Sequence, residues 1–279
     1  MKYFISILLI GLLSHTSLFA QYYYNDIIAT ENTNQYQKLL KQNKIRSIKI
    51  INKDIDGSVV EDFLVEQMIN ADASVITTSS QTSKGNKSVL KSFFTNNTIA
   101  KTTNEGDGVS NTTFYTYDEK GKIQYIESFT KDTFITTQSN ELHEWQYNNN
   151  GIPERLLKIK NKKDTTVVSF VVDENNLVVE EHWKRNGKEI EVYYYYYYNN
   201  KNKLTDIVRY NQRAKKMLPD FMYEYDANGN IKKMIQVIAG GTNYNTWYYT
   251  YNTNGLKEKE VCYDKKKQLL GSLEYLYNN

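Results

Sequence analysis

The chain has 279 residues, of which 40% are hydrophobic and 24% charged, and it carries a formal net charge of +3. This composition is that of a globular protein and argues against a disordered chain. Basic and acidic residues are mixed along the sequence, which argues against nucleic-acid binding, because that function needs a clustered basic face. The 25 tyrosines favour β-strands, since aromatic side chains fit a pleated, half-buried surface.

Residues 1–20 have the features of a secretory signal peptide. A positive start at Lys2 precedes the apolar run Phe4–Leu13, and the pair Ala20–Gln21 is a suitable cleavage site. The apolar run is shorter than the ~20 residues that a membrane-spanning helix needs. We therefore expect export to the periplasm, the outer cell surface or the medium, with no membrane span after signal removal. The single cysteine, Cys262, cannot form an intrachain disulfide, and we expect it to be buried.

Residues 21–44 form a separate N-terminal segment in which the sequence predicts one short helix. The helix is expected over Gln35–Gln42, with Asn34 as its N-cap. It is expected to cover an edge or an end of a sheet, as repeat folds usually require.

From residue 45 to residue 279 strand signals dominate and predict one β-repeat domain. Asp56-Gly57 is a hairpin turn candidate between two alternating segments. The first strands are expected at Ile48–Ile50, Val59–Met68, Ser74–Ser80 and Val89–Phe94.

A motif then returns about every 26 residues, which indicates one structural unit stacked many times. Its first position is an aromatic residue, its second is variable and its third is usually Tyr. Asp or Asn follows, then a short Gly/Asn turn, and then Ile or Leu. The copies are Tyr115–Ile123, Trp145–Ile152, Phe170–Leu177, Tyr196–Leu204, Tyr223–Ile231, Tyr249–Leu256 and the truncated Tyr275–Asn279.

Each copy is predicted to be a β-hairpin. The two aromatic residues are two positions apart, so both rings lie on one face of the strand, which we expect to pack inward. Asp, Asn and Gly after the second ring suit the left-handed conformations of tight hairpin loops. The predicted fold class is therefore all-β: an antiparallel hairpin-repeat meander forming one large coiled or barrel-like sheet, with one short N-terminal helix.

The motif resembles the YD repeat of RHS-type bacterial proteins. Tyr117-Asp118 with Gly121 and Tyr225-Asp226 with Gly229 match that repeat best, and the resemblance covers roughly residues 94–279. It implies a bacterial exported or surface protein built from β-hairpin repeats. The family repeat carries no catalytic residues.

No pattern predicts catalytic, metal-binding or cofactor-binding residues. His143 and His182 lack the spacing of a zinc site, and no serine or cysteine stands in a nucleophile motif. Asp54 and Asp56 imitate half of a calcium loop, but Phe63 stands where a bidentate Glu is required, so a hairpin turn is expected there.

The run of six tyrosines at 193–198 provides the one candidate binding surface. Alternation places Tyr195 and Tyr197 on the outward face, together with Tyr248 from another copy. Exposed rings can stack on sugars or contact a partner protein. We take Tyr195, Tyr197 and Tyr248 as a possible ligand platform, with a glycan or a surface protein as the partner.

The sequence thus predicts an exported, non-enzymatic β-repeat protein acting as a surface or periplasmic binding or scaffold module. The alternatives are an outer-membrane porin-like β-barrel and a secreted glycan-active hydrolase. Glu144, Gln146 and Glu224 on the outward face argue against a lipid-facing band. The sequence leaves open the ligand, the oligomeric state and whether the sheet closes.

Overall fold

The computed structural model describes residues 22–82, 85–185, 187–211, 215–238 and 243–279, so the predicted signal peptide lies outside the described residues. Over these ranges the chain forms one helix, α1 (Asn25–Gln42), and an 18-stranded antiparallel sheet. The strands are β1 (Ser47–Lys53), β2 (Leu64–Ile69), β3 (Val75–Gln81), β4 (Lys87–Thr95), β5 (Thr98–Gly106), β6 (Val109–Tyr117), β7 (Ile123–Asp132), β8 (Thr137–Tyr147), β9 (Pro153–Lys160), β10 (Asp164–Val172), β11 (Val178–Arg185), β12 (Lys188–Tyr198), β13 (Leu204–Asn211), β14 (Lys216–Tyr225), β15 (Ile231–Val237), β16 (Tyr244–Tyr251), β17 (Lys257–Tyr263) and β18 (Leu269–Asn278).

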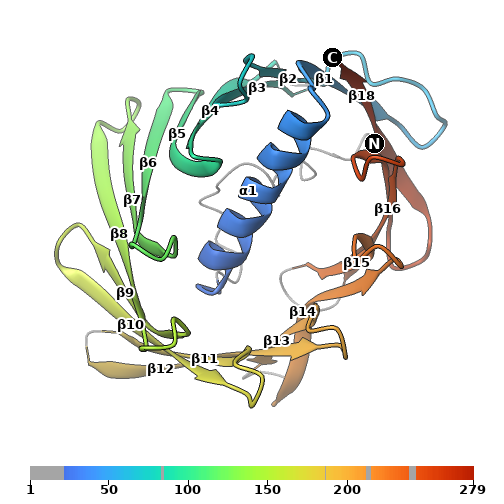
Figure 1. Cartoon of the computed structure of the whole chain (residues 1–279). Helices are drawn as coiled ribbons and strands as arrows, with labels where there is room; N and C mark the ends of the chain where they lie inside the picture. The colour runs from blue at the N-terminus through green and yellow to red at the C-terminus, as the bar shows by residue number, and fades with distance from the viewer. Residues whose placement is uncertain (1–21, 83–84, 186, 212–214, 239–242) are drawn as a thin grey trace.

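The sheet closes into a barrel. Each strand pairs with the next in the chain, and β1 pairs antiparallel with β18 with Ile48 opposite Tyr277 (Figure 1). Closure leaves neither of these two strands with an unpaired edge. The predicted all-β antiparallel meander is confirmed, and its barrel-like form is a closed barrel.

The repeated Asp or Asn shapes the hairpin turns as predicted. In the first clear copy the Asp118 carboxylate accepts backbone N–H groups from Lys120 at 2.9 Å and Lys122 at 2.8 Å, and Gly121 has φ 75°. The short side chain thus replaces a backbone acceptor, and a residue without a Cβ occupies the left-handed position. Equivalent bonds are made by Asn148, Asp173, Asn199, Asp226, Asn252 and Asp264.

The third motif position is a tyrosine in every copy except Phe170–Leu177, which has Val172, and this tyrosine faces the barrel interior and bonds the preceding repeat. The Tyr225 hydroxyl donates to the Leu204 carbonyl oxygen at 2.6 Å, and Tyr251 donates to that of Ile231 at 2.9 Å. The same contact is made by Tyr117, Tyr147, Tyr198 and Tyr277. Inward packing of the aromatic face is therefore confirmed, and these rings are half-buried.

The helix is longer than predicted, and its position relative to the sheet differs from the expected one (Figure 1). It begins at Asn25, and the side chain of its N-cap residue, Tyr24, makes no capping hydrogen bond. Asn34 is not a cap, because its side chain accepts the Ile99 N–H at 2.8 Å. The helix does not cover a sheet edge: it crosses the inside of the ring of strands (Figure 1). Tyr36 bonds Gln67 of β2, and Gln37 bonds the carbonyl oxygen of Ala73 in the turn between β2 and β3.

The start of the helix is held by two carboxylates. Glu181 of β11 is fully buried and accepts the backbone N–H groups of Tyr23 at 2.8 Å and Tyr24 at 2.9 Å. Asp26 in the first helical turn bonds His143 of β8 at 2.6 Å. Negative groups at a helix N-terminus stabilise it through the exposed N–H groups and the helix dipole.

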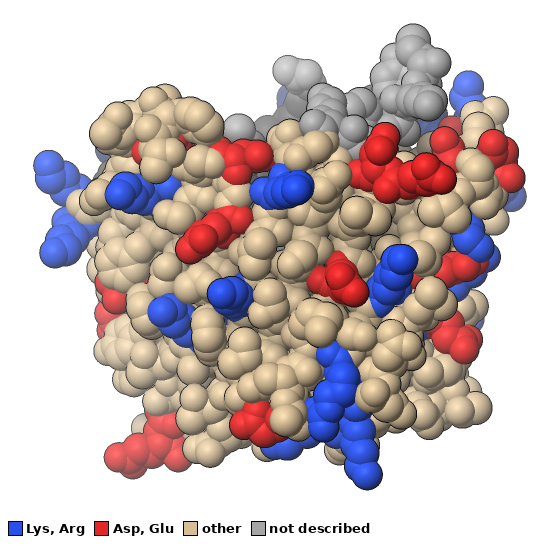
Figure 2. Space-filling view, turned by 90° about the horizontal axis from the view of Figure 1, so that it is seen from above, with Lys and Arg blue, Asp and Glu red and all other residues tan. Residues whose placement is uncertain are grey.

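The interior and the exterior of the wall differ in chemistry. The interior face carries the buried core, including Leu156, Tyr196 and Ile207, and Cys262 is buried there as expected. On the side of the wall that Figure 2 shows, charged residues of both signs are spread over the surface. Several outward charged residues pair across strands: Lys53 with Glu274, Lys259 with Glu274, and Lys233 with Glu224.

No helix in the described ranges combines the length and the apolarity needed to cross a membrane.

Candidate ligand groove on the outer wall

The tyrosine run of β12 divides between the two faces of the wall. Tyr194 and Tyr196 are fully buried in the interior. Tyr193 and Tyr195 are half-buried on the outside, and Tyr197 is 50% exposed. Strict alternation along an extended strand is the reason for this split. The row of outward rings is a linear aromatic strip that runs along β12.

The three residues of the predicted ligand platform do not form one surface. Tyr195 and Tyr197 lie together on β12, as expected. Tyr248 lies on β16, four strands away around the wall, which is about 19 Å at the usual strand spacing. Its ring instead contacts that of Tyr263, with centroids 5.8 Å apart. The sequence places a side chain on a face but does not give the distance between copies around a curved wall.

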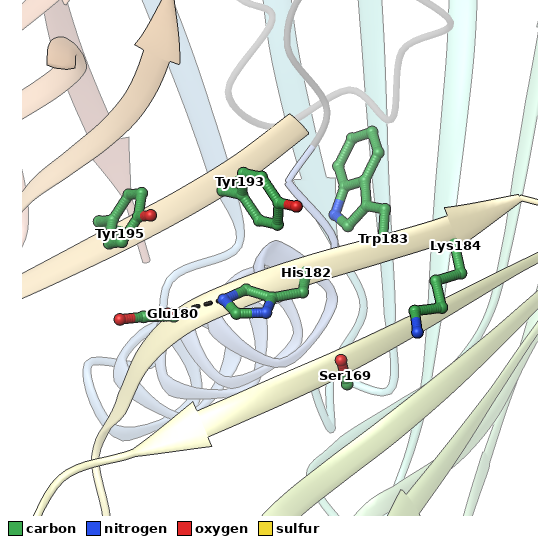
Figure 3. A pocket seen from close by; sticks show the side chains of 7 residues that line it. All are labelled: Ser169, Glu180, His182, Trp183, Lys184, Tyr193 and Tyr195. Carbon is green, nitrogen blue, oxygen red and sulfur yellow. Dashed lines mark hydrogen bonds and ion pairs between the residues drawn. The ribbon is translucent and has the colours of Figure 1, made fainter. Parts of the chain in front are cut away.

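A groove with a volume of about 340 Å³ lies beside the aromatic strip (Figure 3). The wall is irregular here, because β11 and β12 pair His182 with Tyr193 but Trp183 with Ile190. Two residues of β12 therefore have no partner on β11, which is a larger insertion than the single extra residue of an ordinary β-bulge. The groove is lined by Ser169, Glu180, His182, Trp183, Lys184, Tyr193 and Tyr195.

Polar groups flank the rings in this groove. His182 Nε2 lies 2.6 Å from Glu180 Oε2, and the Tyr193 ring meets the His182 ring edge-on at 4.9 Å. Burial, followed by the Glu180 charge, raises the pKa of Tyr195, so this phenol stays protonated and can donate a hydrogen bond. Aromatic faces beside hydroxyl, carboxylate and imidazole groups suit a ligand with both apolar C–H faces and hydroxyl or amide groups.

Sequence analysis did not identify Ser169, Glu180 or His182 as site residues. Ser169 stands opposite His182, and Glu180 stands opposite Tyr195, across three neighbouring strands. These pairings depend on register, and the bulge in β12 shifts that register by two residues. The groove brings together the three residue types of a Ser-His-acid triad, in which the acid is buried. Here the His182 side chain is 37% exposed and that of its acid partner, Glu180, is 35% exposed, so this pair differs from such a triad.

Within the described ranges no group of three or more His, Cys, Asp and Glu residues is arranged to hold a metal ion. The segment that imitates a calcium loop is a turn, as predicted. Asp56 accepts the Ser58 N–H at 2.9 Å and its hydroxyl at 2.6 Å.

No family model matches the sequence, and no curated protein matches it either. Among solved structures, the chain is similar to a porin-like protein from Bacteroides uniformis, with a TM-score of 0.40 and 12% identity over 84% of this chain and 96% of that one. A porin-like protein from Bacteroides vulgatus gives a TM-score of 0.29 and 10% identity over 84% and 98%. The TcdB2-TccC3 structure without its hypervariable C-terminal region gives a TM-score of 0.35 and 12% identity over 75% of this chain and 12% of that one. These likenesses are too distant to transfer a function to this chain.

Proposed function

We propose that this chain is an exported, non-enzymatic β-barrel that binds a glycan or a surface protein through the groove and the aromatic strip of β12. The observation that carries the proposal is the row of outward tyrosines beside Glu180 and His182. The resemblance to YD repeats and the predicted signal peptide support export from a bacterial cell. A barrel of this kind would act as a rigid scaffold that presents the groove on a fixed surface.

The charges of the outer wall favour a barrel in water. Outward positions near the middle of their strands hold Lys91, Lys101, Glu127 and Glu144. A lysine or arginine on the lipid face of a membrane barrel costs roughly 2–4 kcal/mol at the bilayer midplane. With such residues on several strands, a lipid-facing band would be costly to form.

A second candidate is an outer-membrane porin-like barrel. It is favoured by the closed antiparallel wall of 18 strands over the described residues, since barrels of that size span outer membranes. The two candidates differ in whether detergent is needed to extract the protein from cells. We expect the exported chain to leave cells in buffer without detergent, and recovery only in detergent would support the membrane barrel.

A glycan array and a pull-down with the exported chain test the binding proposal. Any ligand that they identify is then measured against variants of this chain. Tyr197→Ala and Tyr195→Ala are expected to abolish binding. Tyr248→Ala is the matched control, because this tyrosine is 45% exposed on the same wall but lies four strands away. A hit that survives both β12 variants, or that Tyr248→Ala weakens equally, would contradict the proposal.

A further inference from the structure

Among the buried polar atoms that lack a hydrogen-bond partner within the described part of the chain, two lie on strands separated by a single strand. They are the hydroxyl of Tyr194 on β12 and the Oδ2 atom of Asp220 on β14. Tyr194 is 0% exposed and Asp220 is 8% exposed. Leaving a buried polar group without a partner destabilises the folded state, so two such groups on either side of one strand need an explanation.

The two groups belong to one cluster, linked by Arg209 of the strand between them. Arg209 stands opposite Tyr194 in register, and its Nη2 donates to Asp220 Oδ1 at 3.2 Å. Tyr194 on β12 and Asp220 on β14 therefore lie on the two strands that flank Arg209. After burial, the charge of Asp220 is the next cause that raises the pKa of Tyr194, which agrees with this placement. No hydrogen bond between described residues joins the two, so a bridging group between them would satisfy both.

The electrostatics of the cluster favour a positive group. Asp220 and the buried Glu181 both raise the pKa of Tyr194, and only Arg209 opposes them. Burial also raises the pKa of Asp220 in spite of its arginine partner, which indicates that Arg209 does not fully compensate this carboxylate. Two carboxyl groups, Asp220 and Glu181 opposite Tyr194, thus face one guanidinium.

Aromatic rings surround the same place. The Tyr22 ring lies with its centroid 5.9 Å from that of Tyr194 and 6.3 Å from that of Phe221, the neighbour of Asp220. Ring faces attract organic cations, and an ammonium group supplies three N–H donors to oxygen acceptors.

We propose that Tyr194 and Asp220 bind the ammonium group of a small organic amine inside the barrel. The N–H donors bond the Tyr194 hydroxyl oxygen and Asp220 Oδ2, and the organic part packs on the neighbouring rings. Arg209 lies at the accessible side of the cluster, because its side chain is 37% exposed although it points inward. This site lies on the opposite face of the wall from the groove and is independent of it.

The test is thermal unfolding of the exported chain with ethanolamine, tyramine and phenylethylamine, each compared with its N-acetyl derivative. The acetylated compounds keep the organic part but lose the charge. At saturating concentration at least one amine is expected to raise Tm by about 2 °C or more, and its acetylated form is expected to have no effect. If no amine raises Tm, or if the acetylated forms act equally, the proposal is overturned.

Two variants locate the effect. Asp220→Asn and Tyr194→Phe are expected to abolish the amine-dependent shift, whereas Asp206→Asn, on the outward face of β13, should keep it. Tyr194→Phe also separates a ligand group from a structural one. It should raise Tm without amine, since it removes an unpaired buried hydroxyl. A Tyr194→Phe protein that is less stable than the parent and still responds to amines would overturn the proposal.

Discussion

Replacing the buried carboxylate of Glu181 should loosen the helix inside the barrel. Its two oxygens accept four hydrogen bonds: Oε1 from the Tyr23 N–H at 2.8 Å and the Trp183 indole at 2.6 Å, and Oε2 from the Tyr24 N–H at 2.9 Å and the Tyr196 hydroxyl at 2.6 Å. Each donor is satisfied by a charged acceptor, so these bonds are of the stronger kind.

The size of the destabilisation follows from the hydrogen bonds that a glutamine side chain can still make at this position. In Glu181→Gln one oxygen still accepts two bonds, but the amide nitrogen takes the place of the other. The Tyr196 hydroxyl can turn and accept from that nitrogen, whereas the backbone N–H of Tyr24 cannot and stays unpaired. One unpaired buried donor and the loss of charge from the remaining bonds give a destabilisation of about 2–4 kcal/mol.

Urea unfolding followed by tryptophan fluorescence measures this change. Glu180→Gln is the matched control, because it is the adjacent residue on the same strand but faces outward and pairs with His182 at the surface. Loss of an exposed pair should cost about 0–1 kcal/mol. Equal midpoints for the two variants would refute the view that Glu181 anchors the N-terminal segment.

Three further changes test other parts of the wall. Burial lowers the pKa of His143, but Asp26 and Glu141 outweigh it and raise the pKa to about 9 from 6.5, so the folded state holds this proton more tightly. The contribution of this proton to the free energy of unfolding, on the order of 3 kcal/mol, is complete below pH 6.5 and is lost as the pH rises through 9. The free energy of unfolding measured across this range should therefore fall less in His143→Gln than in the parent protein. Tyr225→Phe removes the bond to the preceding repeat and should cost about 1 kcal/mol in urea unfolding, and an unchanged midpoint would show that this bond contributes nothing. Burial raises the pKa of the Cys262 thiol to about 12, so a thiol reagent should label it only after denaturation, and rapid labelling of the native protein would contradict its burial.

The strands and turns could be predicted from the sequence because their signals are local. Alternating rings define a face, and Asp118 with Gly121 encodes a turn within five residues. The first half of the helix was missed, because its residues are mostly polar and form no apolar stripe. Burial of its polar residues depends on partners far along the chain, as for Asn34 and Ile99.

Closure of the sheet and the position of the helix could not be predicted, since both depend on contacts between residues far apart in the chain. Ile48 pairs with Tyr277, and no local pattern specifies that pairing. His143 gave no sign in the sequence of its pairing with Asp26, which is 117 residues away in the chain. The outer groove was missed for the same reason, because it depends on the register of three strands.

A single extra residue in each repeat explains how one motif produces both a closed wall and an aromatic interior. In the copy at Tyr223–Ile231, Glu224 pairs with Lys233 and Tyr225 pairs with Ile231, so Lys232 has no partner. The same shift occurs between Thr116 and Tyr117, and again after Gln146, Val171, Tyr197 and Thr250. Without the extra residue, every side chain of the return strand would point to the opposite face, and Lys233 would enter the interior. With it, rings and aliphatic residues remain inside on both strands of the hairpin, and each bulge adds bend and twist. Repeated around the barrel, this bend curves the sheet in one direction until its first and last strands meet.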